Sequence, residues 1–270
     1  MDSASSDKLY IENLYATPLA LEEELPRLAA QARLLFAGQS FFVPKIKLPV
    51  ENGKMLDVGS GPGVHFSLVR KLFPGFSFTG VELAEDLHQY AKMNYPDIDW
   101  KIGSVYKIPV EDASYDVAQA SFLFIHLREP KKALEEINRI LKPGSIFFVL
   151  DVDDSTFKGT ATMTELVKKH LEIYEADRTI MSKLKPIAES TGFEQIAEDF
   201  VYVDNRGKED SPVIEYPNIH LGKMTFWSMF AFMGQRSEVA DVYDIAHRDY
   251  MSSAENFCEI SVIFQAYRKK

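Results

Sequence analysis

The sequence has little cysteine and few histidines. Cys258 is the only thiol among 270 residues, so the chain cannot form an internal disulfide or a four-thiolate metal site. The six histidines are scattered, and none lies in an H-E-x-x-H pattern or a comparable ligand spacing. We therefore expect no metal centre, and a reducing compartment is the simplest setting for the protein.

Basic residues and long apolar runs are also scarce. Lysine and arginine number 30 against 40 acidic residues, which gives a formal net charge of -10. Such a chain lacks the basic surface of a nucleic-acid-binding protein, and anionic membranes would repel it. No apolar run is long enough to span a bilayer, and the polar start "MDSASSDKLY" lacks the apolar segment of a signal peptide. These features predict a cytoplasmic protein whose ligand is a small molecule or is presented by another protein.

Apolar residues are plentiful, at 46% of the chain, and their spacing predicts the fold. An N-terminal helical pattern contains Pro26, which predicts a break or a new start. From Lys54 onward, strand patterns alternate with helix patterns, which is typical of a parallel sheet covered by helices on both faces. We predict an α/β fold: a doubly wound, mostly parallel, seven-stranded Rossmann-like sheet. The predicted parts are an N-terminal helical lid (1–50), an α/β core (51–204), an aromatic-rich cap insertion (205–254) and the last core strand (255–270).

The stretch "MLDVGSGPGVHFSL" places a cluster of glycines directly after the first strand pattern. Gly59, Gly61 and Gly63 lack a Cβ, so the backbone can adopt positive φ and approach a ligand closely. In open α/β sheets, ligands bind beyond the carboxyl ends of the strands, where this loop lies. The nicotinamide fingerprint reads G-x-G-x-x-G, but the third glycine comes one residue early here, which disfavours a nicotinamide oxidoreductase.

Further motifs follow in order. Glu82 ends the second strand pattern, and "IPVEDASYDV", the His126-Leu127 pair with Pro130, and "EEINRILKPG" come after it. With these motifs, residues 54–200 resemble the class I S-adenosylmethionine-dependent methyltransferases, above all the small-molecule branch of quinone and natural-product enzymes. The resemblance implies S-adenosyl-L-methionine as cofactor. It also implies methyl transfer to O, N or C of a partly apolar small molecule, with alignment of acceptor and sulfonium methyl as the main catalytic factor.

The resemblance also implies a set of cofactor-binding residues. The glycine loop and Asp57 would hold the methionine end, Glu82 the ribose hydroxyls, and Ser104 the adenine amino group in place of the usual aspartate. Phe122 would face the sulfonium, where a ring face attracts a cation. The full set is Asp57, Gly59, Ser60, Gly61, Gly63, Glu82, Leu83, Ser104, Val105, Ser121 and Phe122.

The candidates for acceptor chemistry are fewer. His126 after the fourth strand, Asp151 at the tip of the fifth and His220 in the insertion are candidate proton acceptors. Packing or capping is the more common role of a histidine at the position of His126, and an exposed loop position is the simpler interpretation of His220. An acceptor pocket with aromatic walls is predicted from the insertion and the N-terminal lid. Its residues are Tyr10, Tyr15, Tyr216, His220, Phe226, Trp227 and Phe230. A packing helix or a homodimer contact is the other interpretation of the insertion. A module that binds the cofactor without methyl transfer, as a scaffold, partner subunit or rearrangement catalyst, is the alternative function.

Overall fold

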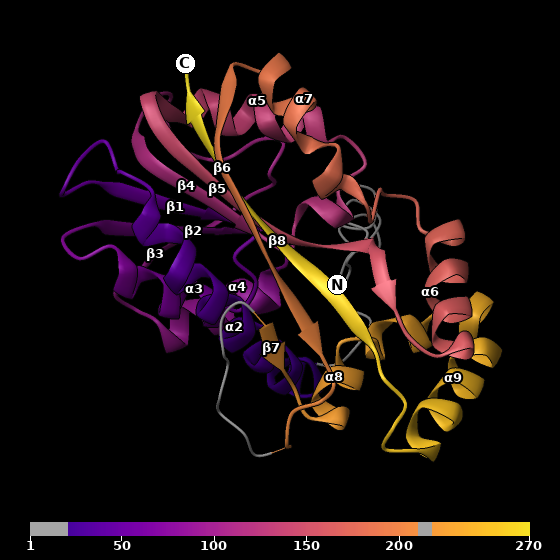
Figure 1. Ribbon diagram of the computed structural model, residues 1–270. Coiled ribbons are helices and arrows are strands. Elements are labelled where there is room, and N and C mark those ends of the chain that lie inside the picture. The colour runs from indigo at the N-terminus through magenta and orange to yellow at the C-terminus, as the bar shows by residue number, and fades with distance from the viewer. Residues whose placement is uncertain (1–20, 210–217) are drawn as a thin grey trace.

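A computed structural model describes residues 21–209 and 218–270. They form a sheet in the order β3-β2-β1-β4-β5-β8-β6-β7 (Figure 1). The strands are β1 (Lys54–Val58), β2 (Ser77–Glu82), β3 (Asp99–Ile102), β4 (Tyr115–Ser121), β5 (Leu141–Lys158), β6 (Phe193–Asp204), β7 (Asn218–His220) and β8 (Glu259–Lys269). β8 lies antiparallel between β5 and β6, and the other neighbours are parallel. The predicted fold class is confirmed, and the short edge strand β7 is an addition to the expected seven.

Burial on both faces explains why the central strands are so apolar. β4 is buried along its length up to Ala120, and in β5 the stretch from Ile146 to Asp154 is buried. Parallel strands covered on both sides read as nearly continuous apolar runs, which is the texture of "SIFFVLDV". The strand order reverses between β1 and β4, so the loops after these two strands diverge and leave room for a ligand.

Helices cover the two faces of the sheet. They are α2 (Leu21–Phe42), α3 (Val64–Val69), α4 (Glu85–Asn94), α5 (Pro130–Ile140), α6 (Ala161–Ile173), α7 (Leu184–Ser190), α8 (Lys223–Ser228) and α9 (Ala240–Ser252). In Figure 1, α5 and α7 lie together on one face, and α2 and α3 lie together on the opposite face. α5 buries Ala133, Leu134, Ile137 and Ile140, the spacing of an amphipathic helix with one face on the sheet.

Pro26 does not interrupt α2, so the predicted break is wrong. A proline inside a helix costs about 3 kcal/mol through the lost hydrogen bond and a clash with the preceding turn. Further along the same helix, Leu34, Leu35 and Phe42 are almost fully buried. Each such side chain contributes about 1.5–3 kcal/mol, so their burial outweighs the cost of the proline.

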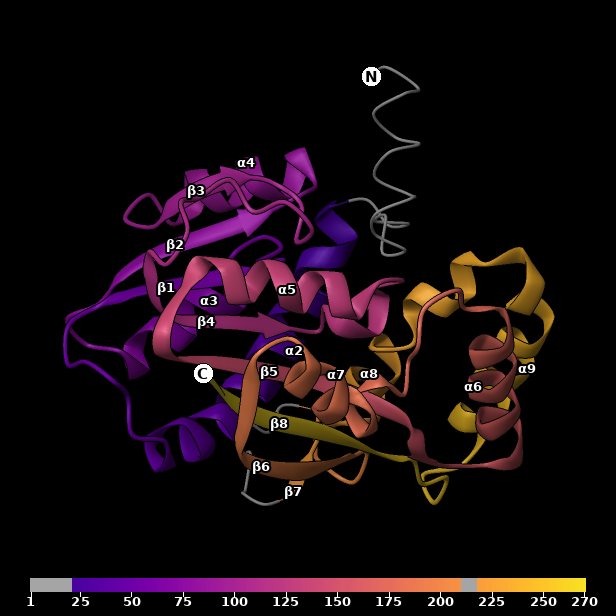
Figure 2. The ribbon, with the colours of Figure 1, turned by 90° about the horizontal axis from the view of Figure 1, so that it is seen from above.

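The segment between β6 and β8 gathers beyond the carboxyl ends of the core strands. It carries β7, α8 and α9, and α9 packs along α6, which follows β5. Figures 1 and 2 both show α6 and α9 side by side at the end of the molecule away from the amino ends of the central strands. We call residues 218–258 the cap. Within the part of the chain that is described, no helix combines the length and apolarity that crossing a membrane requires.

Candidate functional site

The glycine loop adopts the backbone conformation that its composition predicts. Gly59, Gly61 and Gly63 have φ values of +67°, +55° and +78°, a region in which residues with side chains are strained. The backbone amides of Gly59 and Ser60 both donate to the Val81 carbonyl, at 2.9 and 3.1 Å, which ties the loop to β2. A Cβ on Gly61 would meet no atom within 4 Å, so this backbone faces open space.

Glu82 fixes the other side of the loop from the end of β2. Its Oε2 accepts from the Gly61 amide at 2.7 Å, and its Oε1 accepts from the amides of Leu83 and Ala84 at 2.8 Å each. Burial raises the pKa of Glu82, and the three backbone hydrogen bonds oppose that rise. The carboxylate therefore holds its position through the backbone and still has lone pairs for a ligand.

Asp57 ends a chain of buried hydrogen bonds that starts on α2. Gln39 Nε2 donates to Gln119 Oε1 at 3.0 Å, and Gln119 Nε2 donates to Asp57 Oδ1 at 2.9 Å. Burial raises the pKa of Asp57 to about 8, the Gln119 hydrogen bond opposes the shift, and the nearby Glu82 charge adds to it. These hydrogen bonds connect α2, β4 and β1, and they fix the orientation of the Asp57 carboxyl.

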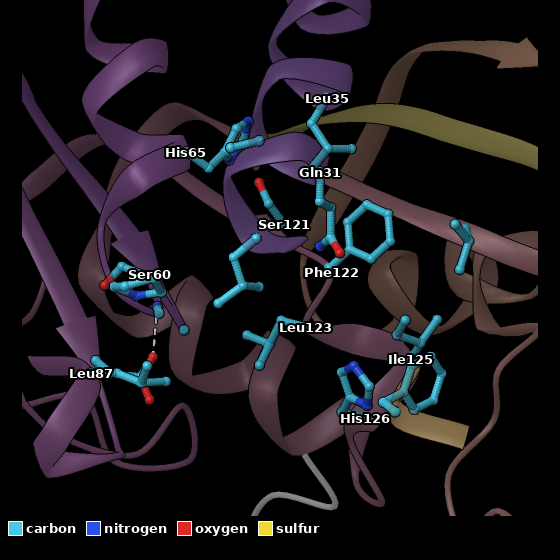
Figure 3. A pocket seen from close by; sticks show the side chains of 18 of the residues that line it. Gln31, Leu35, Ser60, His65, Leu87, Ser121, Phe122, Leu123, Ile125 and His126 are labelled. Carbon is cyan, nitrogen blue, oxygen red and sulfur yellow. Dashed lines mark hydrogen bonds between the residues drawn. The ribbon is translucent and has the colours of Figure 1, made fainter. Parts of the chain in front are cut away.

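A cavity opens at the carboxyl ends of β1, β2, β4 and β5, next to these groups. Figure 3 shows Ser121, at the end of β4, and the next residues Phe122 and Leu123 at this cavity, with Gln31 and Leu35 of α2 beside them. Phe122 has φ +52°, which is unusual for a residue with a side chain and is held by its amide bonding the Leu150 carbonyl at 2.8 Å. Strain at a cavity wall is typical of a functional site.

Two polar atoms in the cavity wall lack a partner among the described residues. Ser121 Oγ and His65 Nε2 are buried and form no hydrogen bond there. Burial lowers the pKa of His65 to about 3, so its ring is neutral. A buried polar atom without a partner is costly, so these two atoms are exceptions in the wall of the cavity.

The far end of the cavity has different chemistry. His126 lines it, and His126 Nδ1 bonds the hydroxyl of Tyr174, a buried residue just after α6. Burial lowers the pKa of His126 well below its usual value, and the positive charge of Arg178 adds to the effect. Arg178 also lines the cavity, and its Nε and Nη2 donate to the two oxygens of Asp154 at 2.6 and 3.2 Å. The ring of His126 is therefore neutral and held in a fixed orientation.

Comparison with known proteins accounts for the loop and the sheet. Residues 56–149 match the family model described as a methyltransferase domain. Residues 56–149 therefore correspond to a methyltransferase domain. The resemblance read from the sequence is thus confirmed, together with S-adenosyl-L-methionine as the cofactor that this family implies.

Individual relatives match only part of the chain. A demethylmenaquinone methyltransferase from Chlorobaculum tepidum is 31% identical over 98 residues, which cover 36% of this chain and 40% of that protein. The chain thus spans well under two thirds of the length of this relative. A putative methyltransferase from Bacillus halodurans has a TM-score of 0.60 at 16% identity and covers 86% of this chain and 99% of its own. The (4+2)-cyclase SpnF has a TM-score of 0.55 at 18% identity, with 85% and 80% coverage. These two structures share the fold.

Most residues assigned to the cofactor lie around one cavity of the methyltransferase domain. Those that line it are Asp57, Gly59, Ser60, Gly61, Glu82, Leu83, Ser104, Val105, Ser121 and Phe122. Gly63 does not line it. A Cβ on Gly63 would lie 2.6 Å from the Trp100 ring, so this glycine lets the ring pack against the loop. Ser104 Oγ accepts from the Tyr106 amide at 3.1 Å, so one of its lone pairs is already used.

Two of the three candidate proton acceptors lie elsewhere. Asp151 is fully buried outside the cavity wall, where its Oδ2 accepts from the Ile125 amide at 3.2 Å and steadies the turn that carries His126. His220 sits on β7 at the sheet edge, because that strand pairs with β6, and its Nδ1 bonds Asp204 at 2.8 Å. Only His126 among the three lines the cavity.

Of the aromatic residues predicted for the acceptor pocket, some line the cavity and others do not. Phe230 lines the cavity, whereas Phe226 and Trp227 are buried inside the cap. Trp227 stacks on Tyr250 with ring centroids 5.5 Å apart, so it contributes to the cap core and not to the cavity wall. Tyr10, Tyr15 and Tyr216 lie outside the described residues.

Sequence analysis missed two parts of the wall. One is the face of α2 with Arg27, Gln31 and Leu35 at four-residue spacing, a signal that was present in the sequence and typical of one helix face. The other is Arg178 with the cap residues Met229, Phe232 and Met233. No local pattern marks these residues, because only the tertiary fold brings them to the cavity.

Proposed function

We propose that this protein is an S-adenosylmethionine-dependent methyltransferase that acts on a partly apolar small molecule. The observation that carries the proposal is the pair of buried carboxylates, Asp57 and Glu82, at the ends of adjacent strands on either side of a glycine loop. A Cβ on Gly61 would meet open space, and Ser121 and His65 line the same cavity. This set of groups fits the cofactor that the family implies.

Each group has a role that follows from its chemistry. The Asp57 carboxylate holds the ammonium of the methionine end, and the Glu82 carboxylate accepts from the ribose hydroxyls. When bound, S-adenosylmethionine supplies a methyl group on a sulfonium, which is a good leaving group. Phe122 presents its ring to that positive charge. Leu83 and Val105 cover the adenine, and the Ser104 hydroxyl bonds its amino group.

The acceptor binds at the other end of the cavity, between the cap and His126. Met229, Phe230 and Met233 provide an apolar wall that excludes water and orients the acceptor. A hydroxyl or an acidic carbon–hydrogen bond must lose its proton as the methyl arrives. The neutral ring of His126, which the Tyr174 hydroxyl holds through Nδ1, is the candidate to accept this proton.

The test is to follow the fate of the cofactor. We expect the protein to bind S-adenosylhomocysteine in calorimetry and to form it from S-adenosylmethionine when phenols, carboxylic acids and amines are offered. His126→Gln should keep cofactor affinity and lower kcat by about 10²–10⁴-fold, the usual contribution of general base catalysis. His247→Gln, which changes a histidine outside the cavity wall, is the matched control.

The alternative is a module that binds the cofactor without transferring methyl. SpnF, which is named a cyclase, has the same fold, so the fold alone is compatible with this function. Tight binding of S-adenosylmethionine with no demethylated product for any acceptor in the panel would favour the alternative.

A further inference from the structure

Three arginines converge on the acceptor end of the cavity, in a chain whose net charge is -10. Arg27 of α2 and Arg178 line the cavity wall and are buried. The Arg236 guanidinium lies 4.8 Å from the centre of the Tyr174 ring, and that of Arg178 lies 5.5 Å from it. The Tyr174 hydroxyl bonds His126, so all three positive charges surround the site of the proposed proton transfer.

Two of these arginines have carboxylate partners among the described residues. Glu24 pairs with Arg27 at 2.5 Å, and Asp154 pairs with Arg178. No carboxylate in residues 21–209 and 218–270 lies within ion-pair distance of Arg236. Asp151 also lies near Arg178, but burial raises its pKa to about 8, so it keeps its proton at neutral pH. The charge of Arg236 interacts with the exposed Glu238, and among the described residues Arg236 is the one of these three arginines without a salt bridge.

The histidines here add no further charge. Burial lowers the pKa of His170 to about 2, with the positive charges of Arg178 and Arg236 contributing, and His126 is neutral for the same reasons. The surrounding rings are Tyr174, Phe232 and His170. A positive field in such an apolar setting is poorly screened and favours an anionic ligand.

Arg178 also has the geometry to bind a planar anion. Asp154 accepts from its Nε and Nη2, and the Tyr174 hydroxyl is a further hydrogen-bond partner, so these contacts leave some of its five N–H donors for a ligand. The Phe232 ring lies 5.3 Å from the guanidinium and helps to fix its plane. A guanidinium edge in a fixed plane binds a carboxylate through two parallel hydrogen bonds.

We propose that the methyl acceptor carries a carboxylate, which binds the remaining N–H donors of Arg178 beside Tyr174 and His126, while Arg236 adds positive charge. The apolar part of the acceptor then packs against Phe230, Met229 and Met233 of the cap. The substrate class is an aromatic or otherwise apolar carboxylic acid. This inference rests on the proposed function, because it takes the cavity beyond the glycine loop as the acceptor site.

The experiment compares acids with neutral molecules of the same shape. We would measure binding of salicylate, 4-hydroxybenzoate and 2-naphthoate, and of the three corresponding carboxamides, by calorimetry with and without S-adenosylhomocysteine. We expect at least one acid to bind about tenfold or more tightly than its amide, the size expected for a charge-assisted hydrogen-bonded pair. Raising the salt concentration should reduce this preference only partly, since the site is buried.

Variants then assign the preference to the arginines. Arg236→Gln should lower the acid-over-amide ratio by about fivefold or more, and Arg178→Lys should lower it similarly by removing the bidentate edge while keeping the charge. Arg70→Gln is the control, because Arg70 is also half-buried and pairs with Asp97 outside the cavity wall. Circular dichroism checks that each variant folds. Because Arg236 is only half-buried, we expect Arg236→Gln to fold, and this variant alone tests the proposal if Arg178→Lys does not fold.

Two results would overturn the proposal: no acid in the panel binding better than its amide, or an acid preference that Arg236→Gln and Arg178→Lys leave unchanged. The same measurements distinguish a failure of the proposed function from a failure of this inference. A protein that prefers acids but does not bind S-adenosylhomocysteine would contradict cofactor binding and leave the anion site in place. Binding of S-adenosylhomocysteine with equal affinity for acids and amides would contradict the carboxylate and leave the cofactor site in place.

Discussion

At the scale of single residues, the protonation of Asp57 couples pH to ligand binding. Its pKa is raised from the ordinary value of 3.8 to about 8, because burial penalises the charged form. Without a ligand, the carboxyl therefore carries a proton at neutral pH. An ammonium group binds the charged form, so binding must displace that proton.

We expect the affinity for S-adenosylhomocysteine to rise as the pH increases toward about 8 and to level off above it. Below that value the change should approach about tenfold per pH unit, the slope for release of one proton. Calorimetry in buffers of different ionisation enthalpy would detect the released proton. Asp57→Asn keeps the Gln119 hydrogen bond and should lose both the affinity and its pH dependence; an Asp57→Asn variant that retains the wild-type pH profile would assign the proton elsewhere.

The same pKa shift predicts the pH dependence of stability. Between about 3.8 and about 8 the folded protein holds the Asp57 proton and the unfolded chain does not. The contribution of this residue to the free energy of unfolding therefore falls as the pH rises through that window and is constant above it. Asp57→Asn should remove this fall, so the variant without ligand should be more stable than the wild type at pH 8. Urea denaturation at pH 5 and pH 8 tests the difference.

The two polar contacts expected at the ribose and the adenine should differ in strength. Glu82→Ala removes hydrogen bonds to a charged group, at about 1.5–3 kcal/mol, so cofactor affinity should fall roughly tenfold or more. The loss also frees the Gly61 amide, which adds to the effect. Ser104→Ala removes a neutral contact and should cost only about 0.5–1.5 kcal/mol. Calorimetry that gives equal affinity for Glu82→Ala and the wild type would refute the ribose assignment.

At the scale of elements, local spacing predicts one half of the site and tertiary contacts build the other. The glycine loop and Glu82 follow strands that a short window of sequence reveals, so the cofactor end could be placed in advance. The acceptor end depends on pairs far apart in the chain: His126 with Tyr174 is separated by 48 residues and Arg178 with Asp154 by 24. No periodicity encodes such pairs. The aromatic content of the insertion predicted Phe226, Trp227 and Phe230 as pocket residues, and only Phe230 of the three lines the cavity.

Two aromatic residues of the cap have different roles: Trp227 packs inside the cap, and Phe230 lines the cavity. Trp227 stacks within the cap, so Trp227→Ala should lower the free energy of unfolding by about 3–5 kcal/mol through the cavity that it leaves. Phe230→Leu keeps most of the volume and should cost less than about 1.5 kcal/mol, yet it alters the surface that meets the acceptor. We therefore expect Phe230→Leu to change KM for the acceptor at unchanged cofactor affinity. Thermal unfolding and turnover would be measured on both variants. If Trp227→Ala and Phe230→Leu changed stability and KM to the same extent, the distinction between a packing residue and a wall residue would be wrong.

At the scale of the whole molecule, the cavity joins segments that the sequence separates widely. α2 supplies one wall, the loops after β1, β2 and β4 supply the floor, and the cap supplies the far wall. The hydrogen bonds from Gln39 through Gln119 to Asp57 link the first of these to the second. A ligand in the cavity contacts all three segments, so it should stabilise them together.

Binding of S-adenosylhomocysteine should therefore protect distant segments from hydrogen exchange at the same time. At a ligand concentration 100-fold above Kd the folded state gains about 2.7 kcal/mol, which should raise Tm by roughly 5–10 °C for a chain of this size. We expect slower exchange in the loop around Gly61, which lines the cavity, and in residues 27–39 of α2, which the hydrogen bonds through Gln119 link to Asp57. Gln119→Leu breaks the link between α2 and Asp57 and leaves the glycine loop intact, so it should reduce the protection of α2 more than that of the loop. Equal protection of α2 in Gln119→Leu and the wild type would mean that α2 responds to direct contact with the ligand and not through these hydrogen bonds.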